Sequence, residues 1–198
     1  VTAFNSAEPG AKADDIATQL AAAGAAHGRF GCHDLVSVLL GANDVIDLYE
    51  NVYLANPTPA TANTVTNELS ARAARLGRAI AAMTDNNAAN AIVSTIPMMN
   101  LTPYARQQAL LHPSANAPGV LSQFSTAFNN SLRLNIPNDG TRWGLVELDA
   151  MTSAAVNNAA GYGLTKVTQA VCTADAPDCD DVAADLVAGG NPTTWLWA

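Results

Sequence analysis

The sequence predicts an α/β fold in which helices alternate with the strands of a parallel sheet. Near-continuous apolar runs at 34–40, 91–96 and 143–148 are separated by segments in which apolar residues recur every three or four positions. Continuous apolar runs are typical of parallel strands, because both faces of such a sheet are covered. Strands that alternate with helices are joined by right-handed crossovers. The expected order of elements is therefore α-β-α-α-β-α-α-β-α-(α)-β.

The first half of the chain is dominated by one long helical pattern. The elements expected here are a helix at 13–26, a strand at 34–40, a helix-like stretch at 45–54 and a helix at 61–83. The apolar stripe of the last helix has helical spacing and consists of Val65, Leu69, Ala73, Leu76 and Ile80. Arg72, Arg75 and Arg78 fall on other faces of this helix. They either form an anion site or belong to a solvated face, and the solvated face is favoured.

The second half continues the alternation of strands and helices. Its expected elements are a strand at 91–96, helices at 101–111 and 120–134, a strand at 143–148, a helix to 156, further helical turns at 182–187 and a strand at 194–197. Asp149 is a plausible N-cap for the helix that ends at 156. The stripe of the helix at 120–134 is expected in the core and consists of Leu121, Phe124, Phe128 and Leu132. We expect one domain spanning 1–198.

The composition restricts the class of protein. Nine Lys and Arg face seventeen Asp and Glu, which gives a net charge of -8 over 198 residues. This acidic balance argues against a general nucleic-acid binder, which needs a basic surface. No apolar run approaches the roughly 20 residues that a bilayer crossing requires. No metal or other cofactor is expected, because the aspartates at 175–185 lack the spacing of a calcium loop and indicate a solvated acidic loop.

The cysteines indicate the compartment. Cys172 and Cys179 bracket a short polar loop that contains a proline, and a disulfide between them is favoured over two free thiols. Cys32 is left over and is expected to be a buried small apolar residue. The bridge, the many Asn and Thr and the scarcity of Lys predict a secreted, periplasmic or cell-surface protein.

The turn Gly41-Ala42-Asn43-Asp44 is the most informative candidate site. In open α/β sheets, ligands bind beyond the carboxyl ends of the strands, and this turn directly follows the first apolar run. Gly41 permits a sharp turn. Asn43 offers a neutral amide donor suited to an oxyanion, and Asp44 could cap the next helix. An ordinary strand-to-helix turn explains these four residues equally well.

A nucleophile and a base are harder to find. The chain has no Gly-x-Ser-x-Gly motif, and Ser37 and Ser94 fall inside predicted strands. His27, His33 and His112 do not follow strands, so surface or structural roles are expected for all three. The sequence also lacks a glycine-rich phosphate loop, which argues against a flavin or nucleotide binder.

Several stretches in chain order resemble the GDSL or SGNH hydrolases. More specifically, they are similar to the secreted lipase and esterase branch, which includes haemolysin-like phospholipases and autotransporter esterases. Gly41-Ala42-Asn43-Asp44 looks like the family's Gly-x-Asn-Asp block. Three other stretches also match: 96–103 (a Pro-containing loop), 128–132 (Phe-Asn-x-x-Leu) and 195–197 (a strand before the last block). The stretch 162–172, which reads Tyr-Gly-Leu-Thr-Lys-Val-Thr…Cys here, resembles the family's Tyr-Gly-Phe-Thr-Asn-Val-Thr…Cys segment.

The resemblance implies acyl transfer to water on a flavodoxin-like sheet with three α/β/α layers. In the family, a Ser nucleophile in a Gly-Asp-Ser block and a His base in an Asp-x-x-His block work with an oxyanion hole. Of that machinery only the oxyanion Asn maps here, onto Asn43, with Gly41 as the turn glycine and Asp44 as the block's Asp. Adaptable apolar residues after the next strand could line an acyl pocket: Pro97, Met98, Met99 and Leu101. Core packing explains them equally well.

The resemblance is incomplete at both ends. The Gly-Asp-Ser block, the oxyanion glycine and the Asp-x-x-His block have no counterpart in the sequence. The preferred hypothesis is therefore an interior portion of an esterase, without its first two strands. The expected partners are a lipid or other ester and a complementing polypeptide segment. The alternative is a non-catalytic interaction or structural module on the same scaffold.

Overall fold

The computed structural model describes residues 2–84, 89–137, 140–173 and 185–197. The chain divides into two compact units. The first unit comprises Val1–Ile96 and Gln123–Leu148, and the second comprises Pro97–Ser122 and Asp149–Ala198. Among the described residues, no helix combines the length and the apolar character needed to cross a membrane.

A parallel sheet organises the first unit. Its strands are β1 (Leu35–Val38), β2 (Asn90–Ser94) and β3 (Trp143–Val146), in the order β1-β2-β3. Val38 pairs with Val93 in the first ladder, and Val93 pairs with Leu145 in the second. The three apolar runs therefore form neighbouring parallel strands, and the mixed α/β class predicted from the sequence is confirmed.

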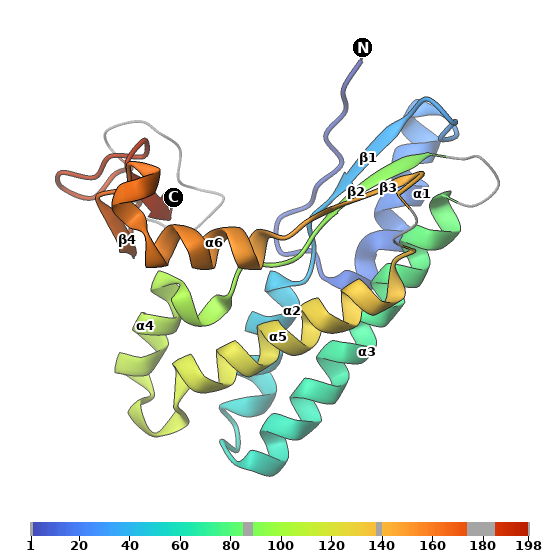
Figure 1. The fold of residues 1–198 in the computed structure, drawn as a ribbon. Helices are drawn as coiled ribbons and strands as arrows, with labels where there is room; N and C mark the ends of the chain where they lie inside the picture. Colours follow the sequence, from blue (N-terminus) through green and yellow to red (C-terminus); the bar gives the residue numbers. More distant parts are fainter. Residues whose placement is uncertain (1, 85–88, 138–139, 174–184, 198) are drawn as a thin grey trace. The chain divides into compact units, whose positions relative to one another are not determined.

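Helices of the first unit supply most of its core. They are η1 (Ala13–Asp15), α1 (Ile16–His27), α2 (Ala42–Leu48), a π-helical turn η2 (Tyr49–Tyr53), α3 (Pro59–Thr84) and α5 (Ala117–Asn135), whose residues from Gln123 onward belong to this unit. The predicted stripe of α3 is at most 1% exposed, and the aromatic residues Phe124 and Phe128 of α5 are fully buried. The helical periodicity thus identified the core correctly, and Figure 1 shows α3 and α5 running beside each other.

The edge strand β1 is less covered than its sequence predicts. Successive side chains of a strand point to opposite faces, so Leu35 and Leu39 share a face that excludes Val38. Leu35 is 61% exposed and Leu39 is 56% exposed, whereas Val38 is buried. The expectation that helices cover both faces of this strand is therefore wrong. Helical crossovers between strands that follow one another in order all lie on one face, which here is the face of Val38.

Two further expectations, one in each unit, need correction. Cys32, which the sequence places in the core, is a free and exposed thiol. It lies in the turn before β1, where its carbonyl accepts a hydrogen bond from the side-chain amide of Asn90 at 3.2 Å. Asp149 is not the N-cap of its helix, because α6 (Leu148–Asn157) already begins one residue earlier.

The second unit holds a separate pair of strands. The strands β4 (Lys166–Ala170) and β5 (Trp195–Trp197) pair in parallel as a two-stranded sheet. The sequence predicted β5 but placed it with the other strands, and it did not predict β4. The remaining elements of this unit are η4 (Met99–Leu101), α4 (Pro103–Leu111), η5 (Pro113–Ala115), η6 (Ala159–Tyr162) and most of α6.

The loop that carries the predicted disulfide is only partly described. Cys172 is buried and forms an antiparallel bridge with Leu186, so no helix is seen at Leu186. Cys179, like the acidic loop considered for calcium and the start of the turns expected at 182–187, lies outside the described residues. The pairing of Cys172 with Cys179 therefore stays a prediction.

Candidate functional site

Gly41 forms the sharp turn between β1 and α2. Its φ is +123°, a backbone conformation that side chains with a Cβ rarely adopt. A Cβ built on Gly41 would lie 2.3 Å from two ring carbons of Phe128 on α5. Backbone strain and steric space therefore both require glycine here, as the sequence predicted for a turn at the carboxyl end of a strand.

Asn43 lies in the first turn of α2, at the end of the sheet where β1 finishes. Its side chain is half-buried, and its Nδ2 donates a hydrogen bond to the carbonyl of Ala11 at 2.9 Å. An amide nitrogen carries two hydrogens, and within the described part of the chain this bond uses one of them. The contact fixes the orientation of the amide, which makes Asn43 a pre-oriented donor at this edge.

Asp44 is fully buried and does not cap α2. One carboxylate oxygen accepts from the backbone N–H of Ala13 at 2.8 Å, and the other accepts from the Arg72 guanidinium at 3.1 Å. Burial raises the pKa of the Asp44 carboxyl above its usual value, and the hydrogen bonds from Ala13 and Arg72 oppose that rise. The predicted cap role is wrong, because Asp44 is already inside the helix and binds a segment 31 residues earlier.

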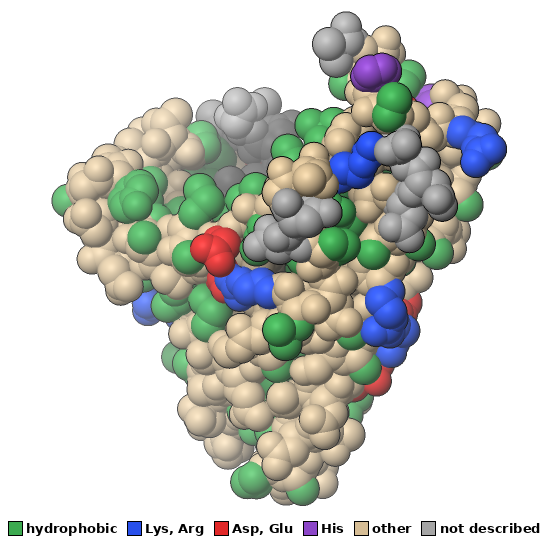
Figure 2. Space-filling model, turned by 45° about the vertical axis from the view of Figure 1, so that its right-hand side comes forward, with side chains coloured by type: hydrophobic (Ala, Val, Ile, Leu, Met, Phe, Trp, Pro, Cys, Tyr) green, Lys and Arg blue, Asp and Glu red, His purple; other side chains and the backbone are tan. Residues whose placement is uncertain are grey.

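An ion-pair network extends from Asp44 along α3. Arg72 also contacts Glu68 at 3.1 Å, and Arg75 forms two hydrogen bonds with the Asp14 carboxylate at 2.7 and 2.8 Å. The bond from Arg75 lowers the pKa of Asp14, and the bond from Arg72 lowers that of Glu68. Charged side chains are sparse on the face in Figure 2, and the red groups there lie beside blue ones.

This network replaces the solvated arginine face expected from the sequence. Arg72 is 17% exposed in its side chain and is engaged on three sides, whereas Arg78 is exposed as predicted. The one local signal for the network is the four-residue spacing of Glu68 and Arg72. The partners of Arg72 on α2 come from a different part of the sequence and could not be found by spacing.

Residues 11–15 form a strap that the network holds against α2 and α3. Besides the contacts of Ala11, Ala13 and Asp14, the Lys12 ammonium lies 3.0 Å from Asp47. The strap therefore bonds to both polar side chains of the turn after β1. Its packing explains why Ala11 and Ala13 are buried in an otherwise exposed N-terminal stretch.

The predicted acyl-pocket residues belong to the second unit, so they are described apart from Asn43. Met99 is 4% exposed, whereas Pro97, Met98 and Leu101 are half-buried. The carbonyl of Met99 accepts a 2.6 Å hydrogen bond from the Thr102 hydroxyl, which in turn caps α4 through Ala105 N–H. Met99 thus has a packing role in the start of α4, and a ligand role for this segment stays a prediction.

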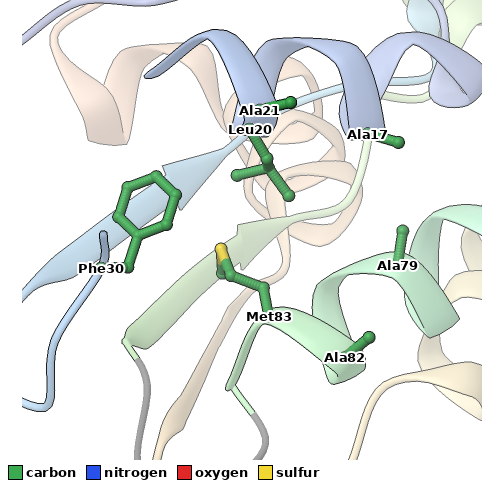
Figure 3. Close-up of a pocket in the computed structure, with 7 residues that line it drawn as sticks. All are labelled: Ala17, Leu20, Ala21, Phe30, Ala79, Ala82 and Met83. Atoms are coloured by element: carbon green, nitrogen blue, oxygen red, sulfur yellow. The ribbon is translucent and has the colours of Figure 1, made fainter. Parts of the chain in front are cut away.

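An open apolar groove of about 450 Å³ lies elsewhere in the first unit (Figure 3). Leu20 of α1, Met83 at the end of α3 and Phe30 before β1 point into it, with alanines completing the walls. Phe30 and Met83 precede β1 and β2, so the groove lies toward the amino ends of the strands, opposite Gly41. Its lining offers no polar side chain for chemistry.

The three histidines have surface or packing positions. The ring of His27 stacks on Phe4 with centroids 3.7 Å apart, and His33 and His112 are exposed. Among the residues that the structure describes, no group of three or more potential metal ligands is found. The turn at Gly41 to Asp44 is one place where polar groups lie at the carboxyl edge of the sheet.

Fold and site together define an α/β protein whose strand-to-helix turn presents an oriented amide beside a buried carboxylate. No protein-family model matches the chain, and no curated protein matches it either.

Replacing Arg72 by methionine should destabilise the first unit by about 3 kcal/mol at pH 7, because it leaves the buried Asp44 carboxylate without its cation. Asp44 has a raised pKa, so its contribution to stability is greatest at low pH and is lost as the pH rises through that pKa. The Arg72-dependent stability of Glu68, whose pKa is lowered, is lost as the pH falls. Both effects make the deficit of Arg72→Met shrink between pH 7 and about pH 3.

Urea unfolding of wild type and variant over this pH range measures the effect. Arg78→Met is the matched control, since Arg78 is exposed on the same helix and should change stability by less than about 0.5 kcal/mol. A deficit that is independent of pH would show that Arg72 stabilises the protein by packing alone.

Proposed function

We propose that the chain belongs to an ester hydrolase of the lipase or esterase type with a flavodoxin-like SGNH fold. The observation that carries the proposal is Asn43, a half-buried amide held by Ala11 directly after the Gly41 turn. This is the position at the carboxyl end of a parallel strand where open α/β sheets bind ligands. The ordered resemblance of five stretches to secreted hydrolases supports the same function and a secreted location.

In this mechanism Asn43 stabilises charge that develops on the substrate. A serine hydroxyl attacks the ester carbonyl, the carbonyl oxygen becomes an oxyanion, and the alcohol leaves as the acyl-serine forms. Water then releases the acid and regenerates the serine. The second hydrogen of the Asn43 amide donates to the oxyanion, and a donor oriented before the reaction needs no reorganisation as the charge appears.

The serine and the histidine base are supplied by a complementing polypeptide segment. Among the described strands, β1 pairs on one side only, with β2, and this edge supports this part of the proposal, since an edge strand presents unpaired backbone groups to an added strand. Exposed Leu35 and Leu39 beside that edge would be covered by the same segment. Parallel sheets are normally buried on both faces, so an uncovered face is a costly arrangement.

Labelling by a fluorophosphonate probe tests the proposal on the protein produced from its whole gene. We expect covalent labelling of a serine and hydrolysis of p-nitrophenyl esters. Hydrolysis should be lost once the probe has reacted with the serine. A mass-spectrometric map of the labelled peptide locates the serine relative to Val1. Absence of labelling and of hydrolysis would contradict the esterase function.

A non-catalytic interaction or structural module is the second candidate. It is favoured by one specific observation: Asn43 and Asp44 both bind the strap, through Ala11 and Ala13, so folding alone accounts for both side chains. This module should bind its partner without any ester hydrolysis. Substitution of Asn43 should then change thermal stability, while wild type and variant alike show no ester hydrolysis.

A further inference from the structure

Helix α4 of the second unit buries a polar side chain and exposes its large apolar ones. The side chain that it buries beside Ala105 is polar, since Gln108 is 7% exposed, and its two leucines are outside. Leu110 is 84% exposed and Leu111 is 61% exposed, and both lie at the C-terminal end of the helix. A helix that packs only against its own protein turns its large apolar side chains inward. The two exposed leucines leave an apolar surface at this end of α4 that the described residues do not cover.

Gln108 makes the arrangement costly. Its Oε1 is buried without a hydrogen-bond partner among the described residues. Leu110 lies on the opposite side of the helix from Gln108, so a rotation that buried Leu110 would bring Gln108 toward solvent, yet the helix keeps the opposite orientation. The capping hydroxyl of Thr102 and the Pro113 turn after His112 fix both ends of α4.

The charge pattern around the leucines indicates the chemistry of the partner. The chain has a net charge of -8, yet the segment 97–122 of the second unit, which contains α4, has no Asp or Glu. Arg106 is exposed one helical turn before Leu110, and His112 directly follows Leu111. We define Arg106, Leu110, Leu111 and His112 as the leucine tip. It is an apolar surface with basic neighbours on an acidic protein.

We propose that the leucine tip inserts into an anionic lipid surface. The two leucines enter the boundary between headgroups and acyl chains, and the long Arg106 side chain reaches back to the lipid phosphates. The missing acidic residues avoid repulsion from the negative surface, which a protein of this net charge would otherwise experience. The proposal does not depend on ester hydrolysis, because lipid binding and catalysis are measured separately.

Co-sedimentation with lipid vesicles tests the proposal on the full chain. With vesicles of equal parts phosphatidylglycerol and phosphatidylcholine, wild type should bind, and Leu110→Ser/Leu111→Ser should lower the partition coefficient at least about tenfold. Arg106→Gln should weaken binding to these vesicles about fivefold and leave weak binding to pure phosphatidylcholine unchanged. Circular dichroism melts verify that each variant is folded.

Leu134→Ser is the matched control, because Leu134 is 85% exposed on α5 of the first unit. It should bind vesicles as wild type does. If Leu134→Ser lowers vesicle binding as much as the double leucine variant does, the effect reflects general surface hydrophobicity, and the proposal is overturned. Failure of the wild-type chain to bind vesicles would also overturn the proposal. This includes the case in which sedimentation velocity shows that the leucine tip joins two copies of the chain.

Discussion

Asn43→Ala should lower kcat for p-nitrophenyl ester hydrolysis by about 10²–10³ in the enzyme that carries its serine and histidine. The substitution removes the amide that donates to the developing oxyanion, while KM changes little because the donor acts mainly in the transition state. Folding should persist, since the lost bond to the Ala11 carbonyl contributes only about 1 kcal/mol.

Asn67→Ala provides the control for this experiment. Asn67 is exposed on α3, so the same chemical change there should leave both kcat and the melting temperature close to wild type. If Asn43→Ala lowers the melting temperature but leaves kcat unchanged, Asn43 is a structural residue that holds the strap. A large fall in kcat at nearly unchanged stability separates catalysis from folding.

Gly41→Ala should destabilise the first unit by about 4 kcal/mol, the largest effect on stability that we expect for a single methyl group. The new Cβ meets two ring carbons of Phe128 at 2.3 Å, and Phe128 is fully buried, so the ring has little room to move. The φ of +123° adds backbone strain for any residue with a Cβ. Urea unfolding followed by far-UV circular dichroism measures the change.

Gly28→Ala separates the two causes. Gly28 has a φ of +96°, and beyond its chain neighbours no atom of the described residues lies within 4 Å of the methyl group that alanine adds. Only backbone strain of about 1–3 kcal/mol is therefore expected, because a φ of +96° with a ψ of 171° is a conformation that essentially only glycine adopts. In the double variant Gly41→Ala/Phe128→Leu, the smaller side chain should relieve the clash, so the loss is less than the sum of the single losses. Additive losses would exclude the contact with Phe128 as the cause.

Local pattern was enough to predict the helices and most strands. The stripes from Val65 to Ile80 and from Leu121 to Leu132 have the spacing of an amphipathic helix, and they are the core of α3 and α5. The apolar runs became β1, β2 and β3 in the expected parallel sheet. The strand β4 was missed because Lys166, Thr168 and Gln169 interrupt any apolar run.

The candidate site was predicted only in its position. The sequence indicated the Gly41 turn and Asn43 as a donor, because strand ends and glycine turns are local features. It did not predict that Ala11 would accept from Asn43, or that Asp44 would be buried against Arg72. These contacts join residues 32 and 28 positions apart, and no periodicity connects them.

By itself the sequence determined the α/β class, the core stripes of the long helices and the turn at the end of β1. Each of these depends on residues within a few positions of one another, where helical or strand geometry sets which side chains share a face. The tertiary structure alone decided that β5 pairs with β4, that Leu35, Leu39, Leu110 and Leu111 face outward, and that the strap binds Asn43 and Asp44. Burial and long-range pairing depend on the path of the whole chain, because the energy of each contact is gained only after distant segments have come together.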